Sequence, residues 1–205
     1  GMDMLAARGC MIVDIGGGTT DMAILSLGGT VTTHSAPIGG THFNDAITRY
    51  IHDIYNVYIG HHTAERVKRL SGCFGTPPSE QPITVPGRDA VTGLPVKISF
   101  RPSEGMAAVE ECVLELVQAI QSMLEITPPE LVGDVLDEGI MLSGGTAQLP
   151  GLRERLEKEI GVRVRVADNP TDCVAIGAGN ADVYLPKMQS GMYSTIYVSN
   201  DNDEW

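Results

Sequence analysis

The sequence MIVDIGGGTTDMAIL, residues 11–25, joins two apolar runs through an acidic residue, three glycines and two threonines. The apolar runs predict two buried strands connected by a tight turn. Glycines allow backbone N–H groups to surround an anion, and threonine hydroxyls add donors. A carboxylate such as Asp14, at the end of the first strand, can hold the water shell of Mg²⁺. The stretch therefore predicts a phosphate-binding turn, and the alternative is a glycine-rich hairpin turn without chemistry.

Composition limits the classes of protein that fit. The 205 residues are enough for one domain with two lobes or for two small domains. A net charge of −12 argues against a nucleic-acid partner and against direct binding to an anionic membrane. The 4 cysteines show no Cys-x-x-Cys spacing, which is typical of reduced thiols in a cytosolic protein. No apolar run reaches the ~18 residues of a membrane span.

Hydrophobic periodicity predicts an α/β fold that begins with an antiparallel three-stranded sheet. Thr41 is the expected N-cap of the first helix, and Gly28-Gly29 the expected hairpin turn between the second and third strands. Strands are expected at residues 9–15, 21–27, 30–36, 83–85, 95–100, 139–142 and 162–166. Helices are expected at residues 42–58, 63–70, 103–126 and 150–160, and from about residue 173. Thr127-Pro128-Pro129 is expected to end the third helix.

Two more stretches are rich in small residues, and each follows an apolar strand. LSGGTAQLP, residues 142–150, contains Gly144, Gly145 and Thr146, for which the alternative is a left-handed turn between strand and helix. NPTDCVAIGA, residues 169–178, predicts the start of a helix whose small residues allow another part of the molecule to come close to its backbone.

A charged group on the second predicted helix is a further candidate. Glu65, Lys68 and Arg69 are spaced so that all three can share one helical face. From spacing alone, a solvated charge pair is the more common fate of such residues.

Together these stretches resemble the ATPase superfamily of actin, sugar kinases and heat-shock chaperones. Residues 14–21 are similar to its second phosphate motif, residues 142–150 to its adenosine motif and residues 169–178 to its second connecting helix. The sequence is most similar to the MreB family of bacterial actin-like rod-shape proteins. That similarity spans residues 9–184 and includes residues 38–40 before 44–47, residues 63–68, and residues 128–131 leading to 138–142.

The resemblance implies one half of a ribonuclease H-like actin-type ATPase domain, with a mixed sheet, flanking helices and a small α+β insertion. A core subdomain would comprise residues 9–56 and 136–184, an inserted subdomain residues 57–135, and a polar acidic tail residues 185–205. The family's N-terminal domain has no counterpart here, so we expect the C-terminal half, domain II. Gly1 before Met2 resembles a cleavage scar, which favours an excised piece.

The resemblance also implies ATP and Mg²⁺ as cofactors, with Asp14 facing the metal through water. The implied phosphate-binding residues are Gly16, Gly17, Gly18, Thr19 and Thr20, and the implied nucleoside-binding residues are Glu65, Lys68, Arg69, Gly144, Gly145 and Thr146. Phosphoryl transfer needs a nucleotide clamped from both sides and an oriented water. We therefore expect no catalytic residue in this piece, at most weak binding of ATP, and no turnover.

For the full-length protein, the resemblance implies ATP-dependent head-to-tail filaments that determine rod cell shape. Its expected partners are other copies of itself, the N-terminal domain, and shape and wall-synthesis proteins. The full-length protein would lie in the cytoplasm at the inner face of the membrane. The part described by this sequence would associate with the membrane only indirectly. The alternatives are half of a chaperone-like or sugar kinase-like ATPase domain, and an interaction module that has lost its nucleotide.

Overall fold

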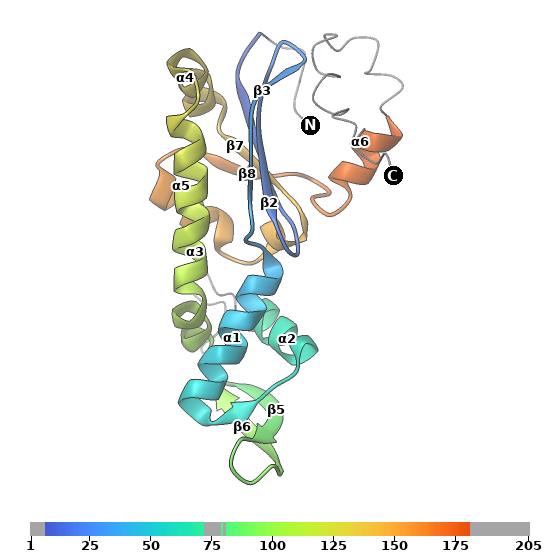
Figure 1. The fold of residues 1–205 in the computed structure, drawn as a ribbon, viewed down its shortest axis with the longest axis vertical. Helices are drawn as coiled ribbons and strands as arrows, with labels where there is room; N and C mark the ends of the chain where they lie inside the picture. The colour runs from blue at the N-terminus through green and yellow to red at the C-terminus, as the bar shows by residue number, and fades with distance from the viewer. Residues whose placement is uncertain (1–6, 72–78, 80, 181–205) are drawn as a thin grey trace, which may run out of the picture.

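A computed structural model describes residues 7–71, 79 and 81–180 of the chain (Figure 1). The expected tail at residues 185–205 lies outside the described residues. The strands are β1 (Cys10–Ile15), β2 (Thr20–Ser26), β3 (Gly29–Ala36), β4 (Val57–Tyr58), β5 (Ile83–Asp89), β6 (Pro95–Phe100), β7 (Ile140–Ser143) and β8 (Val164–Val166). The helices are α1 (Gly40–Tyr55), α2 (His61–Ser71), α3 (Pro102–Glu125), α4 (Pro129–Glu138), η1 (Gly145–Gln148, a 3₁₀ turn), α5 (Leu152–Ile160) and α6 (Cys173–Gly179).

The larger sheet has the strand order β3-β2-β1-β7-β8 and is mixed. β1–β2 and β2–β3 are antiparallel, which confirms the predicted three-stranded start, while β1–β7 and β7–β8 are parallel. Asp14 is in register with Ser143, so parallel β1 and β7 end at the same edge of the sheet. The turn after β1 and the loop after β7 therefore leave the sheet side by side.

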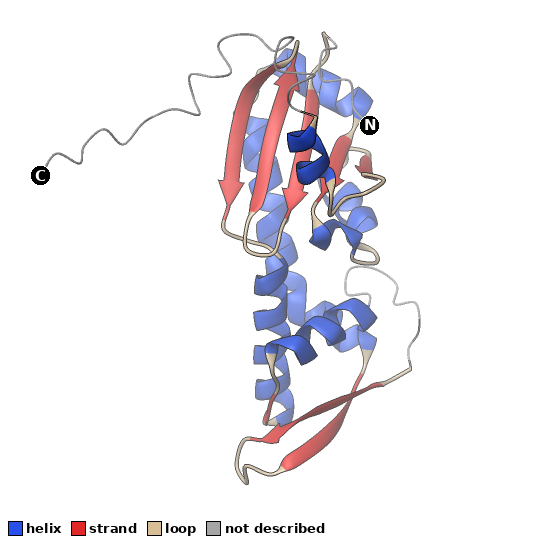
Figure 2. Ribbon diagram, turned by 90° about the vertical axis from the view of Figure 1, so that its right-hand side faces the viewer, coloured by secondary structure: helices blue, strands red, loops and turns tan. Residues whose placement is uncertain are grey.

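One face of this sheet carries the core. Met11, Val13 and Ile15 alternate along β1 and are fully buried, as a strand packed on one face requires. α3 runs along this side of the molecule and contributes a buried stripe that includes Leu116 and Ile120, whereas α6 lies on the opposite side of the sheet (Figures 1 and 2). Burying each such side chain contributes about 1.5–3 kcal/mol. Within the described residues, no helix is long and apolar enough to cross a membrane.

The smaller sheet has the order β4-β5-β6 and lies at the far end of the molecule from the larger sheet (Figure 2). Its strands are antiparallel, and α2 packs against β5. The sheet falls within residues 57–135, the expected insertion, although the division into subdomains stays a prediction.

Both ends of α1 differ from the prediction. The N-cap is Gly39 rather than Thr41, because the Gly40 and Thr41 amides donate to the carbonyls of Gly16 and Gly17 and begin the helix early. The helix ends at Tyr55 rather than residue 58, because Asn56 adopts a left-handed conformation (φ 54°). The next two residues then pair with β5 as β4, a strand that the helical periodicity concealed.

Two other predictions of local structure were wrong. The β2–β3 turn is Leu27-Gly28, both with positive φ (53° and 71°), and Gly29 already pairs with Ser26. This is the backbone of a two-residue hairpin turn, displaced by one residue. α4 was missed because its two prolines were interpreted only as a helix end, whereas Pro128 and Pro129 occupy the N-cap and first-turn positions that tolerate proline.

Candidate functional site

A pocket of about 630 Å³ lies at the shared edge of β1 and β7, with α1 and α2 as its other wall. All three glycine-rich or small-residue stretches contribute to it. Its lining residues are Gly16, Gly17, Gly40, Thr41, Asn44, His61, Glu65, Lys68, Arg69, Gly145, Thr146, Gln148, Leu149, Pro150 and Thr171. The volume lies within the range of about 300–1,000 Å³ that is usual for small-molecule sites.

The turn after β1 directs its carbonyl groups into the protein. The Gly16 amide closes the turn on the Thr19 carbonyl at 2.9 Å. The Gly16 carbonyl accepts hydrogen bonds from the Gly40 amide at 3.0 Å and from Thr146 Oγ1 at 2.9 Å. The turn is therefore held by the start of α1 and by η1.

The backbone amides of Gly17 and Gly18 take no part in the hydrogen bonds that hold the turn. Among the described residues, neither amide donates a hydrogen bond. Neither glycine has a positive φ, and an added Cβ at either position would meet nothing within 4 Å. The described chain therefore requires glycine at neither position, whereas an anion approaching the backbone closely would. Both residues are exposed, so water can satisfy their amides in a hairpin turn without a ligand, but such a turn does not explain the glycine at either position.

The loop after β7 contains two glycines with different surroundings. Gly144 has φ 86° and ψ 160°, a conformation almost confined to glycine, and its Cβ would lie within 3.0 Å of the Ile15 carbonyl and the Asp14 carboxylate. Its amide donates to the Pro170 carbonyl at 2.7 Å, which joins this loop to the one before α6. Gly144 thus lies behind the pocket, while Gly145 and Thr146 line it.

The helical wall contains an ion pair between a buried lysine and a partly exposed glutamate. Lys68 is only 3% exposed, and its Nζ donates to Glu65 Oε2 at 2.8 Å and to the Gly40 carbonyl at 2.9 Å. Burial alone would raise the pKa of Glu65, but hydrogen bonds from Lys68 and Asn44 outweigh it and hold the pKa below its usual value. Glu65 is therefore an anion at neutral pH, and the Lys68 ammonium lies beneath it.

The remaining predicted residues lie beside the pocket rather than among its lining residues. Burial, then the charge of Asp21, raise the pKa of Asp14, while a hydrogen bond from Ser143 opposes them. Thr20 is buried and its hydroxyl donates to the Ile38 carbonyl at 2.8 Å. The Thr19 hydroxyl donates to Asp21 at 3.1 Å. In this structure both threonine hydroxyls thus serve protein acceptors.

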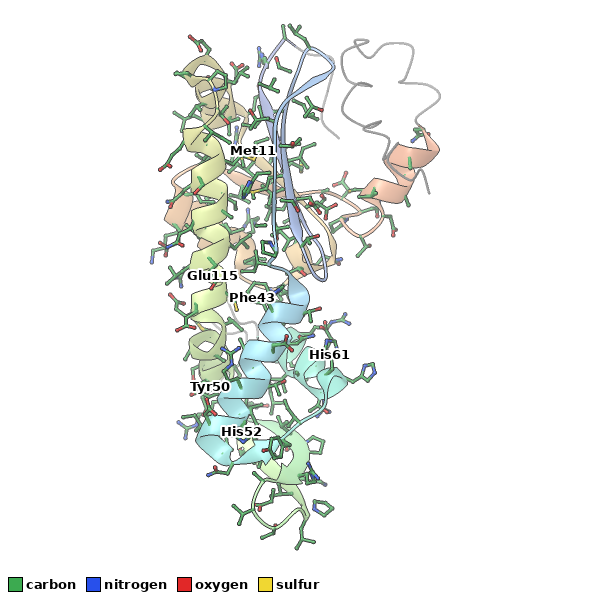
Figure 3. The ribbon with its side chains drawn as sticks, in the orientation of Figure 1. Met11, Phe43, Tyr50, His52, His61 and Glu115 are labelled. Atoms are coloured by element: carbon green, nitrogen blue, oxygen red, sulfur yellow. The ribbon has the colours of Figure 1, made fainter. Side chains whose placement is uncertain are left out.

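Sequence reasoning missed part of the helical wall, notably Asn44 and His61. Asn44 follows Phe43 and lies beside the apolar stripe of Ile47 and Ile51 on α1, but only the structure shows that this polar residue is buried. His61, at the start of α2 (Figure 3), carries no comparable signal, since its role depends on a contact with another helix.

Solved structures define the class of protein. The chain has the actin-like ATPase fold, and it aligns with about half the length of such proteins. It superposes on the MreB5 protein of Spiroplasma citri bound to AMPPNP with a TM-score of 0.86 and 33% identity, covering 91% of this chain and 56% of that one. The ADP-bound form gives a TM-score of 0.87 at 33% identity, with 91% and 57% covered. A MamK double helical filament gives 0.62 at 25% identity, with 79% and 50% covered.

Sequence comparison narrows this class to one family. The chain belongs to the MreB/Mbl protein family, whose sequence model matches residues 1–190. It is 44% identical over 179 residues to the cell shape-determining protein Mbl of Bacillus subtilis, which covers 87% of this chain and 54% of that protein. It is 40% identical over 181 residues to the cell shape-determining protein MreB of Escherichia coli, with 88% and 52% covered. The chain thus spans about half the length of these relatives.

Proposed function

We propose that this chain is the C-terminal half, domain II, of an MreB/Mbl-type cell-shape protein, and that its pocket binds the phosphates and nucleoside of ATP. The observation that carries the proposal is the convergence of three separate loops on one pocket, where the Gly17 amide is free and the free amide of Gly18 follows in the same turn, beside the lining residues. The structures of a relative bound to AMPPNP and to ADP support a nucleotide as the ligand. Family membership favours this function over a chaperone or a sugar kinase.

The pocket offers different groups to the two ends of a nucleotide, main-chain amides to the phosphates and mainly side chains to the nucleoside. Backbone amides of Gly17 and Gly18 would bind the phosphates, as main-chain nests do for anions. Glu65 and Arg69 line the pocket from α2 and would contact the nucleoside, and the backbone at Gly145 would pass beneath it. Mg²⁺ is commonly held by one or two carboxylates together with substrate phosphates, and Asp14 would face it through water. A bound Mg²⁺ would neutralise phosphate charge.

The pocket supplies only one side of the clamp that phosphoryl transfer requires. We expect the other half of the relatives' length to supply the second side. In the whole protein, residues 9–56 with 136–184 would form the core subdomain and residues 57–135 the smaller one. Such a protein would form ATP-dependent filaments at the cytoplasmic face of the membrane and determine rod shape together with wall-synthesis proteins.

Titration of the ¹⁵N-labelled chain with Mg·ATP tests the pocket. We expect millimolar affinity, chemical-shift changes at Gly17, Gly18 and Gly145, and no phosphate release. Gly17→Ala should abolish the changes, whereas the matched control Gly133→Ala, whose Cβ also meets nothing within 4 Å but lies on α4, should not.

Three outcomes would contradict parts of the proposal. Shift changes confined to residues outside the pocket would overturn the assignment of the pocket. Micromolar affinity for Mg·ATP or steady phosphate release would contradict the expectation that this chain supplies only one side of the clamp. Electron microscopy of the full-length gene product with Mg·ATP tests the filaments, which a soluble enzyme would not form.

A further inference from the structure

Glu65 uses its two carboxylate oxygens unequally. Oε2 accepts hydrogen bonds from Lys68 Nζ at 2.8 Å and from Asn44 Nδ2 at 2.9 Å, whereas among the described residues Oε1 accepts none. The side chain is 41% exposed and lines the pocket. One oxygen is therefore fixed by the protein, and the other is available to a ligand.

The charge of Glu65 determines the orientation of the Asn44 amide. An ionised carboxylate only accepts hydrogen bonds, so Asn44 must present its NH₂ group to Glu65 and not its carbonyl oxygen. The same Nδ2 lies 3.1 Å from His61 Nε2. Because Nδ2 can only donate, His61 Nε2 must accept, and the neutral ring carries its proton on Nδ1.

Asn44 keeps this orientation at a cost. It is 1% exposed, and its Oδ1 is buried with no hydrogen-bond partner among the described residues. A buried polar atom without a partner is rare and destabilising. The orientation that leaves Oδ1 unpaired is the one that directs both N–H groups at Glu65 and His61.

We propose that Asn44 is a positioning residue of the nucleoside subsite, which holds Glu65 with Oε1 toward the pocket and is itself fixed by neutral His61. The proposal rests on the function proposed above. The family resemblance implies that Glu65 binds the nucleoside, and a Glu65 held in this way would accept hydrogen bonds at Oε1 from the ribose hydroxyls. The pocket should then prefer ribonucleotides over 2′-deoxyribonucleotides, and this preference should depend on Asn44. Lys68 fixes the other side of Oε2, so Glu65 is held from two helices, α1 and α2.

The first test needs no nucleotide. ¹⁵N side-chain NMR of this chain at about pH 8 should show the His61 proton on Nδ1, with His61→Gln identifying the signal. His62, adjacent in sequence but absent from the pocket lining, is the matched control and should show the Nε2–H form that an unconstrained ring prefers. Asn44→Ala should convert His61 to that form. A His61 proton on Nε2 in the unmodified chain would overturn the network.

The second test compares Mg·ATP with Mg·2′-deoxyATP by NMR titration up to millimolar concentration. The unmodified chain should prefer ATP by roughly tenfold, as expected for one hydrogen bond to a charged group. Asn44→Ala and Asn44→Asp should reduce this ratio to about one, whereas Asp45→Ala, on the exposed side of α1, should retain it. A purely structural role for Asn44 would weaken both nucleotides equally.

The outcomes of the two tests separate the two proposals. If neither nucleotide binds, the proposed function of the pocket fails, together with its ribose selectivity. If both bind equally, the ribose selectivity and with it the positioning role of Asn44 fail, while the nucleotide pocket stands. If the ratio survives Asn44→Ala, only the positioning role of Asn44 fails.

Discussion

The two walls of the pocket are built from different parts of the chain. One wall is main chain, formed by the turn after β1 and the loop after β7, and the other is side chain, formed by Asn44, Glu65 and Lys68 on α1 and α2. Main-chain groups can bind a ligand wherever the backbone runs past it and leaves space for it. Side-chain groups need partners that hold their direction. Here two of these hydrogen bonds join different helices, from Asn44 on α1 to Glu65 on α2 and from Lys68 on α2 to the Gly40 carbonyl of α1. The two walls should therefore respond differently to substitution.

The largest expected effect separates two glycines on the main-chain wall. Gly144→Ala should destabilise the chain by about 3 kcal/mol or more, because the backbone conformation is nearly glycine-only and the Cβ would meet the Ile15 carbonyl. Gly17→Ala should change stability by less than about 0.5 kcal/mol, since its Cβ meets nothing. Urea denaturation measures both. Equal destabilisation would mean that Gly17 serves the fold, as in a simple hairpin turn.

A smaller effect is expected on the side-chain wall. Lys68→Met should cost about 2 kcal/mol, because the Gly40 carbonyl and Glu65 Oε2 lose a donor. The neighbouring Arg69 is exposed and lines the same pocket, so Arg69→Met should stay within about 0.5 kcal/mol. If both variants unfold at the same denaturant concentration, the hydrogen bonds of Lys68 to Glu65 and Gly40 contribute little.

The contrast between the walls also explains what the sequence could predict. Residues 14–21 and 142–150 contain runs of glycine whose spacing after apolar strands indicated the main-chain wall, and the three-stranded start followed from alternating hydrophobicity. Their convergence depends on the parallel pairing of β1 with β7, across more than a hundred residues. No local pattern encodes that pairing, and only the family resemblance suggested it.

The side-chain wall was predicted less completely for the same reason. Glu65 and Lys68 are three residues apart, so their pairing is local and was visible. Asn44 and His61 meet only because α1 packs against α2, so neither was identified. Gly144 was predicted to bind the nucleoside. Its positive φ and the Cβ contacts with Ile15 and Asp14 show that the fold itself requires glycine here. A sequence shows the same glycine whether the close contact is with the protein or with a ligand.

The side-chain wall should also be acid-labile through Glu65. Its pKa is lowered in the folded state, so its contribution to stability is present above the usual value of 4.5 and is lost as the pH falls through the folded pKa. Glu65→Gln should therefore cost about 1 kcal/mol at pH 7, and the difference from the unmodified chain should vanish in acid. Thermal unfolding between about pH 3 and pH 7 measures this. A difference that persists at low pH would show that shape, not charge, is responsible.

The smallest effect should have the opposite sign and lies behind the main-chain wall, at Asp14. Burial and the charge of Asp21 raise its pKa, so its contribution is present below the usual value of 3.8 and is lost as the pH rises through the folded pKa. Asp14→Asn removes the ionised group and should raise Tm by about 1–2 °C at pH 7, with no gain near pH 3. The same variant should weaken binding of Mg·ATP, because an amide is a poorer partner for the water shell of a cation. Asp45→Asn, on the exposed side of α1, should change neither quantity. A lower Tm for Asp14→Asn at pH 7 would show that the ionised carboxylate stabilises the fold, which would contradict the direction of its pKa shift.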